Sequence, residues 1–185
     1  MPVLISLLRG INVGGSHMIK MDALRKAYED AGLRNATTLL QTGNVVFRAV
    51  EPDRAKLAAR IETAIESSAG FRPAVILRTA AEVAQTVSSN PFPEHARTAP
   101  SKLLVTFFAS DPGPNVREAI NATQTGPEQL SMIGSDLYIF FPNGMGRSKL
   151  SFASLERSAK IATTSRNWNT VTKLLNMARS LEESR

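Results

Sequence analysis

The apolar residues of this chain change their spacing in an order that constrains its fold more than any other feature. A continuous apolar run is followed by helical spacing, two short β-prone runs, a second helical pattern and another apolar run. Thr42-Gly43-Asn44 separates the two β-prone runs, and its glycine and asparagine tolerate the positive φ of a hairpin turn. The order is strand, helix, strand, strand, helix, strand, at about residues 3–8, 20–32, 37–41, 45–47, 52–70 and 74–77.

A similar order begins again at Lys102, although the residues themselves do not repeat. Its expected elements lie at about residues 103–109, 116–122, 130–133, 137–141 and 152–161, and no clear closing strand follows before a C-terminal helix at 168–181. The pattern predicts an α+β protein of two ferredoxin-like halves of the βαββαβ type, packed as one unit with a C-terminal helix. The expected parts are one half at 1–78, a linker helix and loop at 79–100, and the second half with the helix at 101–185.

This topology places two glycine-containing loops together. The first two strands of a half point the same way, so the loop after the first and the hairpin after the second lie at one end of the sheet. Residues 9–15 are therefore expected beside residues 41–44. Gly14 and Gly15 are expected to have positive φ, where a β-branched residue would be strained.

The amino-acid composition indicates a cellular compartment and the charge of a binding partner. The chain has no cysteine, so its stability must come from apolar burial, as is typical of a reducing cytoplasm. The first apolar run is too short for a signal peptide or a membrane span, and we expect a cytoplasmic protein with no membrane contact. Lys and Arg number 22 against 16 Asp and Glu, which favours anionic partners, although no basic run marks a nucleic-acid site.

Four separated stretches resemble one known family. They are "RGINVGG" from Arg9, "QTGN" from Gln41, "GMGRSKL" from Gly144 and "TSRNWNT" from Thr164. In order and spacing they resemble the bacterial family called domain of unknown function 1697, except that Thr42 stands where the family is expected to have serine. The resemblance spans nearly the whole chain and implies ferredoxin-like halves. It implies no activity and no catalytic residue.

The same stretches combine cations with residues that leave backbone amides free. Exposed amides and guanidinium groups are what a phosphate or carboxylate needs, and the helix expected after Thr164, Ser165 and Asn167 would present its first amides. The glycine spacing fits neither a dinucleotide fingerprint nor a Walker loop. The alternative is that the glycines only permit tight turns and that the last stretch only caps a helix. The candidate ligand-binding residues are Arg9, Asn12, Gly14, Gly15, Lys20, Gln41, Asn44, Arg147, Ser148, Lys149, Arg166 and Asn167.

Evidence for catalysis is sparse. His17 lies in the first glycine loop and is the one weak candidate for an acid or base, although a loop histidine is more often only solvated. The chain has no cysteine and no pair of histidines at metal-binding spacing, so no metal and no cofactor are expected. Trp168 is expected in the core, as are Tyr138 and Phe140, whose strand lacks the aromatic signature of an RNA-binding sheet.

We expect the protein to bind a phosphorylated or otherwise anionic ligand through its glycine-rich loops. Nucleic acid is the leading polymeric form of that ligand, and Arg9, Lys149 and Arg166 are expected to converge on one anion site. Two alternatives stay open. One is an enzyme acting on a nucleotide or phosphorylated metabolite, with His17 or Lys149 transferring a proton. The other is a non-catalytic protein-interaction module whose motifs are structural.

Overall fold

The computed structural model describes residues 1–123 and 126–184, which form two compact units. The first unit contains residues 1–84 together with the C-terminal stretch from Lys173, and the second contains residues 85–172. The C-terminal stretch is tied to the first unit by Arg48, whose guanidinium donates hydrogen bonds to the carbonyls of Leu181 and Ser184. The prediction had placed the whole C-terminal helix with the second half.

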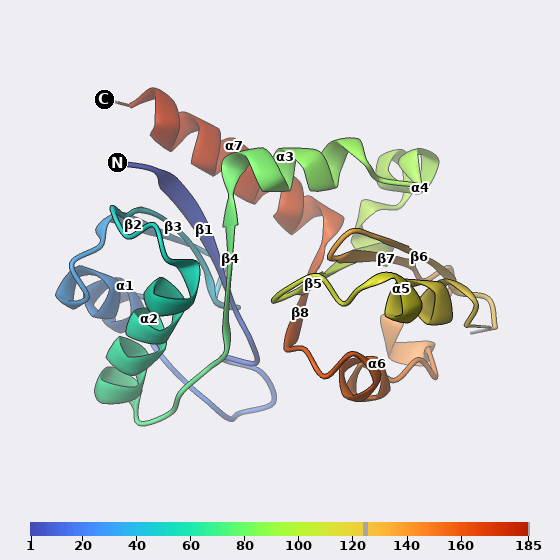
Figure 1. Cartoon of the computed structure of the whole chain (residues 1–185), viewed down its shortest axis with the longest axis horizontal. Coiled ribbons are helices and arrows are strands. Elements are labelled where there is room, and N and C mark those ends of the chain that lie inside the picture. Colours follow the sequence, from blue (N-terminus) through green and yellow to red (C-terminus); the bar gives the residue numbers. More distant parts are fainter. Residues whose placement is uncertain (124–125, 185) are drawn as a thin grey trace. The chain divides into compact units, whose positions relative to one another are not determined.

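The first unit is a ferredoxin-like half with the predicted order of elements (Figure 1). Its four strands form an antiparallel sheet in the order β2-β3-β1-β4, with α1 and α2 on one face. Between that face and the helices lies a core that includes Leu8, Tyr28, Phe47 and Leu57, all with no exposed surface. The elements are β1 (Val3–Leu8), α1 (Met21–Asp30), β2 (Arg34–Leu39), β3 (Asn44–Arg48), α2 (Arg54–Ala69) and β4 (Val75–Thr79).

The second unit repeats this arrangement. Its antiparallel sheet has the order β6-β7-β5-β8, and α5 and α6 contribute Ile120 and Phe152 to a core against Leu104, Phe108 and Ile139. The sheet elements and helices are β5 (Leu103–Phe108), α5 (Pro114–Asn121), β6 (Gln129–Ile133), β7 (Asp136–Phe140), α6 (Phe152–Ala159) and β8 (Thr163–Asn167). Between the strand sets run α3 (Ala80–Ser88), α4 (Pro93–Thr98) and the 3₁₀ turn η1 (Pro100–Lys102); a second 3₁₀ turn, η2 (Met145–Arg147), follows β7, and α7 (Trp168–Glu183) ends the chain.

The second half has a closing strand, which the sequence pattern did not reveal. β8 pairs with β5 along its whole length, from Thr163 opposite Phe108 to Asn167 opposite Leu104. Its sequence, Thr-Thr-Ser-Arg-Asn, has no apolar residue, so neither a continuous nor an alternating apolar pattern marks it. β8 is held by its backbone pairing with β5 and by the 2.7 Å hydrogen bond between the hydroxyls of Ser165 and Thr106.

The segment between the halves contains a helix that was expected to be loop. Residues 90–93 had the composition of a linker, but α4 begins at Pro93, since the first turn of a helix does not use the N–H that proline lacks. His95 of α4 stacks on Phe140 with the ring centroids 3.6 Å apart.

The aromatic residues of β7 are covered by α4 and by α3. Tyr138 donates a 2.6 Å hydrogen bond to the carbonyl of Thr86 in α3. The expected burial of Tyr138 and Phe140 is confirmed, and their rings are unavailable for stacking on bases.

No helix among the described residues is both long enough and apolar enough to cross a lipid bilayer.

Candidate functional site: a basic pocket in the second unit

The first glycine loop lies beside the β2–β3 turn, as predicted, and Asn12 fixes it there. The Asn12 side-chain amide donates to the carbonyls of Gln41, at 2.7 Å, and Ile19, at 3.0 Å, while its Oδ1 accepts from the Ile19 N–H at 2.8 Å. These three hydrogen bonds hold the glycine loop against the β2–β3 turn. The Asn12 side chain, a candidate for ligand binding, therefore has a structural role.

The β2–β3 turn is closed by its own buried residues. Asn44 is fully buried and donates to the Leu39 carbonyl at 2.9 Å and to Thr42 Oγ1 at 3.1 Å. The hydroxyl that Thr42 keeps in place of the expected serine is thus an acceptor within the turn. Gly43 has a φ of +77°, and a Cβ there would lie 2.7 Å from Leu8 Cβ. The turn is built for close packing against β1 and leaves Asn44 no access to a ligand.

Positive φ at Gly14 (+62°) and Gly15 (+77°) is confirmed, and both glycines face open space. A pocket of about 490 Å³ lies on the α1 side of this loop, lined by Asn12, Met18, Ile19, Lys20, Met21, Asp22 and Gln41. It combines one cation, Lys20, with one carboxylate, Asp22, which pairs with Arg25. Neither Arg9 nor the glycines line it. The local charge of this pocket is balanced.

A larger pocket of about 660 Å³ lies in the second unit. It is bounded by the loop after β7, by the serine-bearing side of α6, and by the segments on either side of residues 124–125 that join α5 to β6. The lining residues are Thr123, Gly126, Pro127, Glu128, Asn143, Arg147, Lys149, Leu150, Ser151, Ser154 and Ser158. A volume of several hundred cubic ångströms suits a small-molecule ligand.

A series of tight turns brings the two cations of "GMGRSKL" to this pocket. The Gly144 N–H bonds to the Phe141 carbonyl, and Arg147 and Ser148 continue the turns through backbone bonds of 3.2 and 3.1 Å. Gly144 has a φ of +83°, a conformation that L side chains rarely adopt. Leu150 and Phe152 then pack on the core of the second unit. The loop is anchored at both ends, and the cations project from its middle.

The opposite wall of the pocket is also fixed. Asn121, the last residue of α5, accepts a 2.7 Å hydrogen bond from the Met132 N–H through Oδ1, which ties α5 to β6. Three serines of the α6 segment, Ser151, Ser154 and Ser158, line the pocket with the i, i+3, i+7 spacing of one helical side. Ser151 also caps α6, since its Oγ accepts from the Ser154 N–H at 3.2 Å.

The two cations of the pocket are exposed, and among the residues that the structure describes neither forms an ion pair or a side-chain hydrogen bond. Glu128 provides the one carboxylate of the lining. The lining therefore carries a surplus positive charge and several hydroxyl groups. Three of these hydroxyls already donate within the chain: Thr123 to the Ala119 carbonyl, Ser154 to Ser151 Oγ and Ser158 to the Ser154 carbonyl. The two cations are therefore the main donors that the lining offers to phosphate oxygens.

Two other candidates of the second unit, Ser148 and Asn167, serve the fold. Ser148 does not line the pocket; its Oγ accepts from the Leu150 N–H at 3.0 Å. Asn167 caps α7, accepting from the Thr170 N–H at 3.0 Å, whereas Thr164 and Ser165, which were expected to cap that helix, lie within β8. Trp168 is buried, as predicted.

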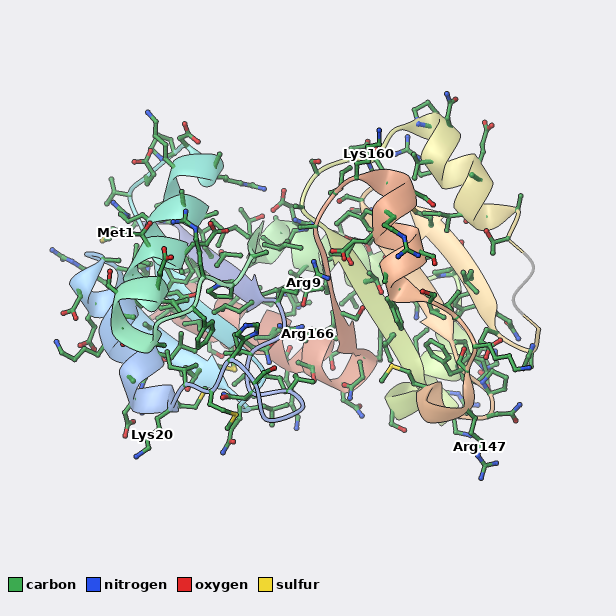
Figure 2. The ribbon with its side chains drawn as sticks, turned by 90° about the horizontal axis from the view of Figure 1, so that it is seen from below. Met1, Arg9, Lys20, Arg147, Lys160 and Arg166 are labelled. Atoms are coloured by element: carbon green, nitrogen blue, oxygen red, sulfur yellow. The ribbon has the colours of Figure 1, made fainter. Side chains whose placement is uncertain are left out.

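Arg166 is buried in β8 and does not line the pocket that Lys149 lines. Its Nη1 donates to Thr164 Oγ1 at 2.8 Å and to the Ser165 carbonyl at 2.7 Å, and burial lowers its pKa to about 10. Figure 2 shows Arg147 and Arg166 at separate places in the second unit. Arg78 occupies the same register position in the first unit, opposite Ile5 as Arg166 is opposite Val105, and is also buried. The repeat of a buried arginine at one position of both sheets indicates a structural role.

Two candidates of the first unit lie apart from its pocket. Arg9 is exposed, and its N–H bonds to the Ala74 carbonyl at 3.0 Å. It belongs to a different unit from Lys149 and Arg166, so convergence of the three stays a prediction. The exposed His17 ring lies 4.9 Å from the ring of Phe71, and a catalytic role for His17 also stays a prediction.

The pocket also contains residues that the sequence reasoning did not select: Thr123, Glu128, Asn143, Ser151, Ser154 and Ser158. The serine spacing was a usable signal, because residues 151, 154 and 158 share one side of an expected helix that follows two cations directly. Thr123 and Glu128 precede β6 in a loop without any motif, so only the folded chain brings them to the cations.

Comparison with known proteins gives a family and a fold. The family model described as "Protein of unknown function (DUF1697)" matches residues 1–138. The structure of the conserved bacterial protein SP0830 from Streptococcus pneumoniae is similar, with a TM-score of 0.69 and 21% identity over 97% of this chain and 99% of the other. No curated protein matches.

Proposed function

The chain belongs to the DUF1697 family, whose function is unknown, and from that premise we propose that it binds a small phosphorylated ligand in the pocket of the second unit. The observation that carries the proposal is the pairing of Arg147 and Lys149, two cations without ion pairs among the described residues, with the hydroxyl-rich side of α6 in one cavity. Arginine can grip two phosphate oxygens with its planar fork, and lysine adds a compact charge.

The pocket of the second unit fits an anion better than the pocket of the first. The first-unit pocket is smaller, and its one lysine is accompanied by Asp22. Its apolar residues Met18, Ile19 and Met21 offer no donors to phosphate oxygens from their side chains. The second-unit pocket has two cations, one carboxylate and four hydroxyl side chains. We therefore assign the anion to the "GMGRSKL" loop and not to "RGINVGG".

The first test is the loss of phosphate binding in the double variant Arg147→Ala with Lys149→Ala. A charge-assisted hydrogen bond contributes about 1.5–3 kcal/mol, so removing two cations is expected to weaken inorganic phosphate binding by at least about a hundredfold. The readout is the melting temperature as a function of phosphate concentration, because a ligand that binds only the folded state stabilises it by mass action. Wild-type protein is expected to gain stability with phosphate, and the double variant to gain almost none.

The matched control removes the same charge elsewhere, in Lys173→Ala with Arg179→Ala, two exposed cations of α7. The control is expected to respond to phosphate as the wild type does. Equal responses in both double variants would contradict the proposed site. A small phosphate ligand predicts a weak salt response, whereas steep salt dependence with short oligonucleotides would favour nucleic acid as the ligand.

A further inference from the structure

The loops at one end of the first sheet expose a group of apolar side chains that phosphate binding in the second unit does not use. Val13 and Leu40 are each 57% exposed, and Met18 is 62% exposed. The glycine loop between β1 and α1 contains Val13 and Met18, and the β2–β3 turn contains Leu40. The hydrogen bond from Asn12 to the Gln41 carbonyl joins these two segments. Single exposed apolar residues are common on proteins, whereas a group from two adjoining segments, here called the apolar patch, indicates an interaction surface.

The backbone holds the apolar patch in position. The tip of the glycine loop is a small hairpin, in which the Asn12 N–H bonds to the His17 carbonyl at 3.1 Å and Val13 forms a β-bridge with Ser16. Leu40 has a φ of +58°, a left-handed conformation that is unfavourable for a bulky L residue. An exposed leucine in this conformation benefits the fold neither by burial nor by its backbone. Strained residues of this kind cluster at binding sites.

The pocket of about 490 Å³ in the first unit adjoins the apolar patch. Met18 of the patch lines it together with Met21, and the chain neighbours of the other two patch residues, Asn12 and Gln41, line it as well. Methionine side chains adapt their shape to an apolar partner. A pocket beside an apolar patch receives a side chain that projects from a bound protein segment, whereas a lipid surface has no such projection. The shape therefore favours a protein segment as the occupant.

The charge around the apolar patch selects the partner further. Within residues 9–20 and 40–44, with histidine neutral, the charged side chains are Arg9 and Lys20, both positive and exposed. Asp22, the carboxylate that lines the pocket, pairs with Arg25, and Lys20 forms no ion pair among the residues that the structure describes. Complementary charge favours one partner over another and speeds its approach. The partner is therefore expected to carry carboxylates.

We propose that the apolar patch and the adjoining pocket bind a segment of a partner protein that combines an apolar side chain with carboxylates. The apolar side chain enters the pocket and contacts Met18 and Met21, and a carboxylate of the segment contacts Lys20. Residues beside that side chain pack on Val13 and Leu40. The segment binds loops that are already ordered, which lowers the entropy cost of association. This interaction needs no phosphate and goes beyond the proposed function.

The test is an NMR titration of the wild-type protein with capped peptides that have a leucine, methionine or phenylalanine between two pairs of aspartates. Matched probes have lysines in place of the aspartates. The aspartate peptides are expected to bind at least about tenfold more tightly than the lysine peptides and to shift the amides of Val13, Met18 and Leu40. Lys20→Gln is expected to reduce this preference, since it removes the charge that a carboxylate contacts. Failure of every aspartate peptide to bind, or equal affinity for the lysine peptides, would overturn the proposal.

The variant Leu40→Asn separates binding from folding, because asparagine adopts a left-handed backbone more readily than leucine does. Its free energy of unfolding is expected to stay unchanged or to rise, while its affinity for the aspartate peptides falls by about tenfold. The control Val50→Asn changes a side chain that is 72% exposed and lies outside the apolar patch, and it is expected to alter neither quantity. A lower stability of Leu40→Asn would show that Leu40 serves the fold and would contradict the proposal.

Other occupants of the apolar patch predict different results. Binding of the wild type to phosphatidylserine vesicles, or a monomer–dimer equilibrium of the wild type, would overturn a segment of a partner protein as the occupant if Leu40→Asn abolished it. Leu40→Asn is expected to bind inorganic phosphate as the wild type does, because the phosphate site lies in the second unit. The phosphate site and the apolar patch are therefore tested separately.

Discussion

Replacing Gly43 with alanine is expected to lower the free energy of unfolding of the first unit by about 3 kcal/mol. Two costs add: an L residue held in the left-handed region costs about 1–2 kcal/mol, and overpacking costs about 1–3 kcal/mol. The added Cβ would meet Leu8 Cβ at 2.7 Å and Ile11 Cγ1 at 2.9 Å. Neither neighbour can withdraw, because Leu8 is fully buried and its N–H bonds to the Gly43 carbonyl at 2.8 Å.

Urea denaturation measures this loss, with Gly14→Ala as the matched control. Gly14 also has a positive φ, +62°, but an added Cβ there meets nothing within 4 Å. The control is expected to lose only about 1 kcal/mol, the conformational cost alone. Equal losses in the two variants would show that the close approach of Gly43 to β1 contributes nothing to stability.

Replacing Asn12 with alanine is expected to destabilise the glycine loop by about 3 kcal/mol. The change removes all three side-chain hydrogen bonds and leaves the N–H and carbonyl of Ile19 and the carbonyl of Gln41 without the partner they have. Leaving a part-buried polar group unsatisfied costs about 1–3 kcal/mol. Hydrogen exchange of the Ile19 amide provides a local readout, and its protection is expected to fall together with the global stability.

Two further variants separate the parts of this effect. Asn12 has a φ of +54°, so Asn12→Gly removes the same bonds without conformational strain and is expected to be about 1 kcal/mol less damaging than alanine. Asn12→Asp keeps the oxygen that accepts from the Ile19 N–H, but it replaces the donating amide nitrogen with a second oxygen. That oxygen would face the carbonyls of Ile19 and Gln41 and repel them, so this variant is expected to destabilise the loop as well. Unchanged Ile19 protection in Asn12→Ala would contradict the structural role.

The prediction from sequence succeeded where apolar spacing and turn residues agree. Gly70, for example, ends α2 with a φ of +75°, and Leu57, Ile61 and Ile65 of that helix are buried, as their spacing predicts. The prediction missed β8, because its polar residues leave no apolar pattern to detect, although its pairing with β5 completes the second sheet. Helix and hairpin signals are local, whereas an edge strand is specified by its neighbours.

The candidate site residues were also predicted correctly only in part. Arg147 and Lys149 were found because they flank glycines and serines within one short motif. Arg166 and Asn44 were selected by the same reasoning, but both are buried. Arg166 bonds within β8, and Asn44 bonds to Leu39 and Thr42 of its own hairpin. Polar residues next to glycines serve a turn as often as a ligand, and only their burial distinguishes the two. The pocket position of Glu128 could not be predicted, since it depends on the folding of β6 beside the loop after β7.

The central claim is that phosphate binds in the second-unit pocket, and NMR tests it most directly by following each backbone amide during titration with inorganic phosphate. The amides of Arg147, Lys149 and Ser151 are expected to shift together with one dissociation constant, and those of Gly14, Gly15 and Lys20 to stay in place. The Asn12→Gly variant is expected to show the same set of shifts, because its loop serves the fold of the first unit. Shifts at Gly14, Gly15 and Lys20 with none from Arg147 to Ser151, or no shifts at all, would contradict the claim.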